Sequence, residues 1–439
     1  MSRSRNKRLL PSIAGLFLLL VPSLAMLSPE PVWGFRFGVN ADNWDRQIKK
    51  PAFVEALRRM KVEFIVWHLS PEEEVSPERL MEIVNFCRQN NWGYLFNTEL
   101  VNYVPKVPHF QQPDGTYRWD LKPPTMKQLE NDPLFLGVVY DEPELMQSML
   151  GVKLKDNAVP PYFADTRKLD PRDAYEEVVK KTKELVNYYG RSKKRLVFEM
   201  VFPDYAHGPA RGGAILAPKL LKENFNDLMY YVYAGAARQY SLPELWACVD
   251  LWFLDKFPEA GRTKPGGHTP EELYQALLFA FERGFDYVYV EHMKGLADQS
   301  FNLTAYGRKV VEFQNTRTTP RSLSWRTFVP QQVIKRFPDG YWGQKYSSFI
   351  PNHPYGAWIK DETPSAEALS WLKLLNRLSQ GKIPGEANNW NAVNHDYFRR
   401  TPYIAEANLP PLLVLDHLFT LPGSFAQAQT IDLTSKKDQ

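Results

Sequence analysis

The sequence predicts an α/β protein folded as a (β/α)8 TIM barrel, with long loops on the catalytic face and an appended C-terminal segment. Three observations support this prediction. From about residue 35 onward, β-like and α-like segments alternate along the chain. The β-like runs are rich in Val, Phe, Tyr and Leu on both faces, which is typical of buried parallel strands. No Gly-rich phosphate-binding motif follows the first run, which argues against a dinucleotide-binding open sheet.

Seven β-like runs are expected as barrel strands, and helix signals separate them. Ser76-Pro77 and Asp170-Pro171 are typical helix starts, and Thr269 with Glu272 forms a capping-box pattern. The eighth strand is expected at Phe328–Phe337, with Leu412–Asp416 as the alternative. The seven runs cover residues 35–40, 63–69, 92–97, 134–142, 195–203, 245–254 and 285–291.

This strand count predicts the domain limits. The barrel is expected over residues 35–382, followed by an appended segment over 383–439 that ends in a frayed polar tail. Long inserts at 101–133, 143–169, 204–222 and 338–363 follow expected strands. Loops that follow barrel strands lie at the carboxyl end of the barrel, so these inserts are expected to surround the active site.

The N-terminus resembles an export signal. Four basic residues between Arg3 and Arg8 precede an apolar run over residues 9–27, and Ser23-Leu-Ala25 provides small residues for cleavage. Residues 1–27 are therefore predicted to be a signal peptide or a membrane anchor, with residues 9–27 as the tether in the second case. Both alternatives predict an extracytoplasmic protein, secreted or membrane-anchored.

Composition narrows the function classes. The net charge is only +4, with 54 basic and 50 acidic residues, which is too balanced to predict a nucleic-acid partner. Aromatic residues make up 14% of the chain, and aromatic rings are common platforms for sugars. The two cysteines, Cys87 and Cys248, lie in apolar patterns far apart, and no Cys and His spacing indicates a metal site. Neither a metal nor a cofactor is predicted.

Two glutamates carry the predicted chemistry. Glu142 ends the run Leu134-Phe-Leu-Gly-Val-Val-Tyr-Asp-Glu142, and Glu291 ends the run Phe285-Asp-Tyr-Val-Tyr-Val-Glu291. Counted as barrel strands, these are the fourth and the seventh. A protonated carboxyl and a carboxylate about 5 Å apart can cleave a glycosidic bond with retention of configuration.

In these two motifs the chain resembles the large clan of retaining barrel glycoside hydrolases. The clan places its acid/base in an Asn-Glu-Pro motif ending strand four and its nucleophile, a Glu, at the end of strand seven. The resemblance implies that Glu142, followed by Pro143, is the acid/base and that Glu291 is the nucleophile. Asp141 stands where the clan usually has an Asn that binds the 2-hydroxyl, and its charge would help Glu142 to keep a proton.

Other polar and aromatic residues at strand ends are expected to bind the carbohydrate substrate. They are Asp141, Asn40, His68, Asn97, Trp252, Asp255, His292, Asp339 and Trp342. Two alternative functions remain open at this point. One is an inverting glycosidase that uses the Asp141/Glu142 pair with a more distant carboxylate such as Asp255. The other is a catalytically silent barrel that binds polysaccharide at the cell surface.

Overall fold

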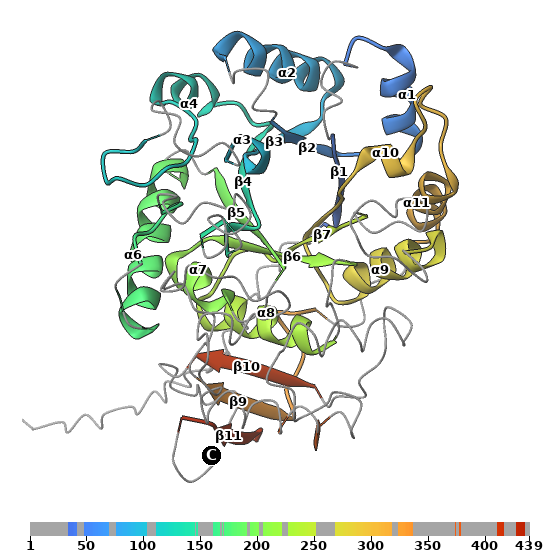
Figure 1. Ribbon diagram of the computed structural model, residues 1–439. Helices are drawn as coiled ribbons and strands as arrows, with labels where there is room; N and C mark the ends of the chain where they lie inside the picture. The colour runs from blue at the N-terminus through green and yellow to red at the C-terminus, as the bar shows by residue number, and fades with distance from the viewer. Residues whose placement is uncertain are drawn as a thin grey trace, which may run out of the picture. The chain divides into compact units, whose positions relative to one another are not determined.

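The computed structural model contains a closed barrel of eight parallel strands, in the order β1 to β8 (Figure 1). This confirms the predicted fold class. Each strand pairs with its neighbours along the chain, and β8 pairs with β1 to close the ring. The structure describes residues 34–41, 48–69, 76–102, 111–144, 146–147, 161–166, 169, 171–190, 194–201, 205–221, 227–251, 268–317, 324–336, 374, 377–378, 411–416 and 427–434.

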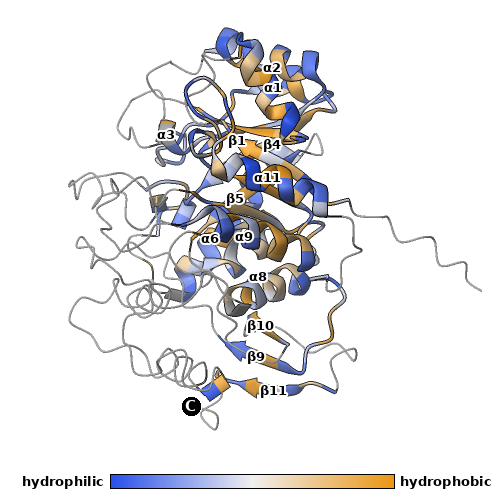
Figure 2. Cartoon of the chain, turned by 90° about the vertical axis from the view of Figure 1, so that its right-hand side faces the viewer, coloured by the Kyte–Doolittle hydropathy of each residue, from blue (hydrophilic) through white to orange (hydrophobic). Residues whose placement is uncertain are grey.

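The barrel strands are short and almost entirely buried, because helices cover their outer faces. Hydrophobic residues dominate the strands, and the helices carry polar residues on their surfaces (Figure 2). The strands are β1 (Arg36–Asn40), β2 (Phe64–His68), β3 (Gly93–Asn97), β4 (Phe135–Asp141), β5 (Arg195–Met200), β6 (Ile215–Leu220), β7 (Trp246–Val249) and β8 (Tyr287–Val290).

The helices begin where the sequence provides caps. The side chain of Ser76 accepts a hydrogen bond from Arg79 N at the start of α2, and Thr269 and Glu272 form the expected capping box before α9. The described helices are α1 (Pro51–Arg59), α2 (Pro77–Asn90), α3 (Glu99–Asn102), α4 (Pro123–Leu129), α6 (Pro171–Gly190), α7 (His207–Gly212), α8 (Asp227–Gln239), α9 (Pro270–Glu282), α10 (Met293–Leu296) and α11 (Ala305–Thr316).

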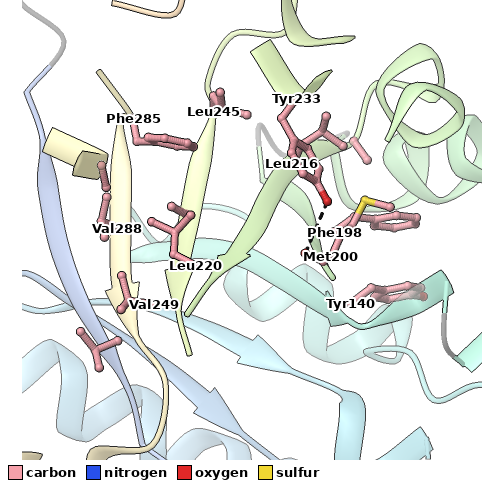
Figure 3. Close-up of a cluster of buried hydrophobic side chains, with 14 of the residues drawn as sticks. Tyr140, Phe198, Met200, Leu216, Leu220, Tyr233, Leu245, Val249, Phe285 and Val288 are labelled. Carbon is pink, nitrogen blue, oxygen red and sulfur yellow. Dashed lines mark hydrogen bonds between the residues drawn. The ribbon is translucent and has the colours of Figure 1, made fainter. Parts of the chain in front are cut away.

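The side chains of each strand alternate between the helical layer and the barrel interior. Figure 3 shows part of the outer core, where Phe198 and Met200 of β5 lie near Leu216 of β6 and Tyr233 of α8. A separate cluster fills the interior and includes Phe64, Val66 and Tyr289. Gly38 belongs to this interior layer, because a Cβ there would lie 2.5 Å from the ring of Phe64. The alternation therefore sends every second residue into the barrel.

Two strand predictions were wrong. One barrel strand was missed and one strand outside the barrel was counted, so the predicted total of eight strands still agrees with the structure. Residues 215–220 form β6, within the insert expected over 204–222. The run expected as the sixth strand is β7, and the run before Glu291 is β8 and not the seventh strand. The expected eighth strand, Phe328–Phe337, contains β9 (Gln332–Arg336), which lies outside the barrel.

A second, three-stranded parallel sheet is formed by β9 together with β10 (Leu412–Asp416) and β11 (Gln429–Asp432), in the order β10-β9-β11. The free edge of β10 is covered by side chains of the barrel helices. Gln239 Oε1 accepts a hydrogen bond from Asp416 N, and His207 Nε2 lies 3.2 Å from Val414 O. A Cβ at Gly235 of α8 would lie 2.1 Å from Val414 O, so a glycine is needed at this contact.

The predicted export leader, residues 1–27, lies outside the described residues. Among the helices that the structure describes, none combines the length and the apolar character needed to cross a bilayer.

Candidate active site

A ring of eight polar side chains lines the interior at the carboxyl end of the barrel, one from each strand or the residue directly after it. We call this set the polar ring. All eight side chains are buried. In chain order they are Asn40, His68, Asn97, Asp141, Glu199, Lys219, Asp250 and Glu291.

The strand register shows that these side chains point inward. Partners across a parallel ladder share one face of the sheet. Lys219 pairs with Cys248, and Asn40 pairs with Val66, and both partners belong to the interior cluster. Between some neighbouring strands, the ring residue lies two positions beyond the partner of its neighbour. A shift of two residues keeps the side chain on the inward face of the sheet. The polar ring is therefore a continuous layer above the hydrophobic interior.

Lys219 is the centre of the polar ring. Its side chain is 1% exposed, and its Nζ contacts five carboxylates. The distances from Nζ are 3.0 Å to Asp141 Oδ1, 3.4 Å to Glu142 Oε1, 2.9 Å to Glu199 Oε1, 3.4 Å to Asp250 Oδ2 and 2.9 Å to Glu291 Oε2. One ammonium thus faces carboxylates from β4, β5, β7 and β8.

Glu142 and His292 lie directly after ring residues on opposite walls, since β4 and β8 are four strands apart in a ring of eight. Both residues have left-handed backbones, with φ of 47° at Glu142 and 65° at His292. Such conformations are uncommon for residues other than glycine and cluster at functional sites. The left-handed turn keeps Glu142 buried at the ring, and it places His292 Nε2 3.8 Å from both Asp250 Oδ1 and Glu291 Oε1.

Crowding of the carboxylates determines where protons reside. Burial raises the pKa of Asp141 well above its ordinary value, and the charge of Glu199 raises it further. Burial and the nearby Asp250 raise the pKa of Glu291 well above its ordinary value, although Lys219 opposes the shift. Five carboxylates around one cation cannot all ionise without strong repulsion. The arrangement therefore favours the protonated form of one or more of these carboxyls.

The pKa of Lys219 is raised as well, and for a lysine this favours the charged form. Burial by itself lowers the pKa of an ammonium, but the surrounding carboxylates, Asp141 and Glu199 foremost, raise the pKa of Lys219 well above its ordinary value. The side chain therefore stays a cation throughout the neutral range.

A second pair of polar residues, one from β2 and one from α3, extends the site. His68 Nε2 lies 3.2 Å from Glu99 Oε2. Although burial opposes it, the hydrogen bond from His68 lowers the pKa of Glu99 below its ordinary value. The site thus contains an ionised carboxylate close to carboxyls that favour their protonated form, which is the pairing that acid–base catalysis needs.

The two asparagines of the polar ring differ in their partners. Asn97 Nδ2 donates to Asp141 Oδ2 at 2.7 Å, and its Oδ1 accepts from Glu99 N at 3.0 Å. Asn40 has no exposed surface, and among the described residues neither its Oδ1 nor its Nδ2 has a hydrogen-bond partner. A buried polar group without a partner is costly, so its presence indicates a ligand-binding role.

Several sets of three side chains in or beside the polar ring come close enough to hold a metal ion. One is His68, Asp141 and Glu291, whose candidate ligand atoms lie within 4.8 Å of one another. Within the part of the chain that the structure describes, every such set includes a carboxylate that contacts Lys219. A divalent cation would therefore compete with the lysine ammonium for the same oxygens.

The structure brings together most of the predicted site residues. Glu142, Glu291, Asp141, Asn40, His68, Asn97 and His292 all lie in or directly beside the polar ring. The remaining predicted residues lie outside the described residues; they are Trp252, Asp255, Asp339 and Trp342.

Lys219 was missed because its strand was missed. The run Ile215-Leu-Ala-Pro-Lys-Leu220 contains a proline, which normally argues against an interior strand. One signal was present, since Lys219 is a lone charge within a short apolar run. Asp250, which ends the hydrophobic run of β7, was missed as well.

No family model matches this sequence, and comparison with curated proteins found no match either. Solved structures with a similar fold include a GH5 cellulase from an Icelandic hot spring isolate, with 13% identity, a TM-score of 0.39 and coverage of 66% of this chain and 90% of the cellulase. A putative alpha-L-fucosidase from Bacteroides thetaiotaomicron has 10% identity and a TM-score of 0.37, covering 62% of this chain and 85% of the fucosidase. The 3-dehydroquinate dehydratase from Aquifex aeolicus has 10% identity and a TM-score of 0.32, covering 65% of this chain and 100% of the dehydratase. Because these proteins carry out different chemistries by name, the similarity describes the barrel alone.

Proposed function

We propose that this protein is a glycoside hydrolase that cleaves an oligo- or polysaccharide with retention of configuration, with Glu142 as acid/base and Glu291 as nucleophile. The observation that carries this proposal is the shared contact with Lys219. Glu142 Oε1 and Glu291 Oε2 come from opposite walls of the barrel and lie 3.4 and 2.9 Å from the same nitrogen. The two carboxyl groups therefore face each other at the carboxyl end of the barrel, where barrel enzymes place their active sites.

The separation supports retention over inversion. The two oxygens both contact Lys219 Nζ, at 3.4 and 2.9 Å, so they lie closer together than the roughly 6.5 Å at which inverting pairs begin. Retaining pairs are about 5–5.5 Å apart, and inverting pairs, which leave room for a water molecule, begin at about 6.5 Å. The inverting alternative needs a more distant carboxylate than either of these.

The proposed reaction has two balanced steps. First, the ionised Glu291 attacks the anomeric carbon, the glycosidic bond breaks, and the proton of Glu142 passes to the leaving oxygen. Second, Glu142 takes a proton from water while the water oxygen attacks the anomeric carbon and the ester bond to Glu291 breaks. Since burial favours the protonated form of Glu291, we expect turnover to rise with pH until this carboxyl has ionised.

The remaining polar-ring residues are proposed to bind the sugar. The carboxamide of Asn40 can donate to one hydroxyl and accept from another, and a bound sugar would supply the partners that the described residues do not. His68, Asn97 and Asp141 belong to the same ring, and His292 lies directly beside it. Trp252, Asp255, Asp339 and Trp342 remain proposed substrate contacts from the sequence.

A barrel that only binds polysaccharide would not need this charge arrangement. Taking several carboxylates out of water costs several kcal/mol for each ion, and one ammonium compensates only part of that cost. A binding surface needs hydroxyl partners and aromatic faces, not carboxyls with a raised pKa. The crowding therefore favours catalysis over silent binding.

A Schiff-base mechanism through Lys219 is the other chemistry that a buried barrel lysine suggests. That mechanism requires a neutral amine as nucleophile, produced by a lowered lysine pKa. The surrounding carboxylates raise the pKa of Lys219 instead, so the structure favours an ion-pairing role for this residue.

The test is a pair of substitutions assayed on a panel of aryl glycosides and polysaccharides. Glu142→Gln removes the proton donor, so hydrolysis of substrates with poor leaving groups should fall most, while activated aryl glycosides are partly spared. Glu291→Ala should abolish turnover, and added azide should restore it with a product of inverted configuration, because azide replaces the nucleophile.

Glu184→Gln is a matched control, because Glu184 lies on the outer face of α6 and its side chain is 52% exposed. It should behave like the wild-type protein. Full activity in either active-site variant would refute the assignment. Substrate binding without hydrolysis by the wild-type protein would favour the polysaccharide-binding barrel.

A further inference from the structure

Both members of the proposed catalytic pair share one counter-ion. Lys219 Nζ lies 2.9 Å from Glu291 Oε2 and 3.4 Å from Glu142 Oε1. The lysine comes from β6, on the wall between the strands that carry the two glutamates. Its ammonium can therefore contact either carboxylate without a change of strand or backbone.

The proposed reaction moves one negative charge between these two contacts. Before the first step, Glu291 is the carboxylate and Glu142 carries the proton. In the glycosyl-enzyme, Glu291 is a neutral ester and Glu142 is the carboxylate. The second step returns the charge to Glu291. The negative charge thus alternates between two oxygens that contact the same nitrogen.

We propose that Lys219 is a positioning residue that remains protonated and serves as the common counter-ion of Glu291 and Glu142, pairing with each in turn through the two steps. This inference rests on the proposed glycosidase function. A fixed cation beside both positions stabilises the charge wherever it resides and needs no rearrangement during the reaction. The proposal includes no covalent role for the lysine.

The surroundings of Lys219 explain why it stays charged. The other titratable groups that face it or lie close by are Asp141 on β4, Glu199 on β5, Cys248 and Asp250 on and after β7, Tyr289 on β8 and, farther away, His68 on β2, Glu99 on α3 and His292 after β8. Two of these are fixed by other donors, since Tyr289 OH donates to Glu199 and Asn97 donates to Asp141. Glu291 also accepts from the Cys248 thiol at 3.6 Å. Among the described residues, Lys219 is the one ammonium in contact with both proposed catalytic carboxylates.

The first test is Lys219→Met, which keeps the length and the apolar stem but removes the charge. We expect kcat to fall by about 10²–10³-fold, as for the loss of one preorganised electrostatic contact. The acid limb of the pH–kcat/KM profile should move to higher pH, because Glu291 then ionises less readily. In Lys219→Ala, added ethylammonium or propylammonium should restore part of kcat and return the acid limb toward its original position.

Lys219→Arg separates charge from position. Its guanidinium keeps a positive charge but cannot occupy the site of the ammonium, so the acid limb should stay close to the wild-type pH while kcat falls. This variant also retains a cation among the carboxylates, so it can be studied if Lys219→Met does not fold. Lys194→Met is the matched control, because Lys194 lies at the opposite end of the barrel, with Nζ 2.6 Å from Asp132 O.

A second readout does not depend on activity. With ¹³C-labelled Asp and Glu side chains, carboxyl chemical shifts followed against pH show which groups keep a proton. Lys219→Met should raise the titration midpoint of at least one polar-ring carboxyl relative to wild type, whereas Lys194→Met should leave the polar-ring carboxyls unchanged.

Unchanged carboxyl titrations in Lys219→Met, or a fall in kcat without movement of the acid limb and without alkylammonium rescue, would overturn the proposal. If the wild-type protein hydrolyses no glycoside, the proposed function fails. In that case the carboxyl titration still decides whether Lys219 controls the ionisation of the ring.

Discussion

Buried carboxylates are paired with cations in different ways at the two ends of the barrel. At the amino end, each buried carboxylate has its own cation. Arg195 Nε and Nη2 donate to Glu244 at 2.5 and 2.6 Å, and Arg326 donates to Asp286 at 2.8 and 3.0 Å. Paired carboxylates of this kind close the amino end of the interior.

Aromatic packing reinforces the amino end. The rings of Trp246 and Tyr287 stack with centroids 4.3 Å apart, and the Arg195 guanidinium lies 5.2 Å from the Tyr287 centroid. Trp246 Nε1 also donates to Glu244 at 2.9 Å. Each polar group here has a partner and an apolar support, which is the pattern of a structural network.

At the carboxyl end, five carboxylates share the single ammonium of Lys219. This arrangement lowers the free energy of unfolding, because like charges are held together out of water. Such an arrangement makes physical sense where its shifted protonation states are used. We infer that the amino end, where each described buried carboxylate has its own cation, stabilises the fold. The carboxyl end, where carboxylates outnumber cations, is the end suited to catalysis.

The largest expected effect is that a substitution at the carboxyl end lowers turnover but not stability, whereas one at the amino end lowers stability but not turnover. Glu291→Gln should reduce turnover by at least about 10³-fold, because the amide cannot act as nucleophile. The same change should leave stability equal or raise it by about 1 kcal/mol, because one crowded carboxylate is removed. Glu244→Gln should leave turnover unchanged but lower stability by about 3 kcal/mol, because Arg195 loses its buried partner.

Thermal denaturation and steady-state kinetics on both variants check this expectation. If Glu291→Gln proved the less stable of the two, the carboxyl end would be a structural network as well, and the contrast between the ends would be lost.

The next effect is a pH dependence of opposite sign at the two ends. Asp141 and Glu291 have pKa values raised in the folded state, by burial first, so their contribution to stability is fully present below their unfolded pKa and is lost as pH rises through the folded pKa. At the amino end, Leu134 N, Tyr94 and Arg88 hold the pKa of Asp132 below its ordinary value against the effect of burial. Its contribution is present above the unfolded pKa and is lost as pH falls through the folded pKa.

Urea unfolding between about pH 2 and pH 9 measures both slopes, each up to about 1.4 kcal/mol per pH unit for one group. Asp141→Asn should flatten the loss of stability on the alkaline side, while Asp132→Asn should flatten the loss on the acid side. A common slope for both variants would contradict the assignment of opposite shifts to the two ends.

Much of the fold followed from local patterns. The alternation of short apolar runs with capped helices predicted the barrel, since both signals arise from residues close together in the chain. The strand count failed at β6 because Pro218 and Lys219 both disfavour an interior strand locally. In the structure, Lys219 is compensated by carboxylates from four other strands, and no local pattern contains that information.

The candidate site was predicted in part for a related reason. Polar residues at the carboxyl ends of strands must converge in a parallel barrel, so Asn40, His68, Asn97, Asp141 and Glu291 could be grouped before any register was known. Their roles could not be distinguished, because partners depend on the two-residue steps between neighbouring strands. The sequence therefore predicted the members of the ring better than its central residue.

The smallest expected effect distinguishes two asparagines within the ring. Asn97 has partners on both sides of its carboxamide, whereas Asn40 has none among the described residues. Asn97→Leu should lower stability by about 1–3 kcal/mol, because Asp141 Oδ2 and Glu99 N lose a buried partner. Asn40→Leu, with a similar shape, should not lower stability but should raise KM by about 5–10-fold, equivalent to about 1 kcal/mol for one lost hydrogen bond to a sugar hydroxyl. Melting temperatures and KM for both variants, on the same substrate, check this difference. Equal losses of stability with unchanged KM would show that Asn40 supports the fold in the way that Asn97 does.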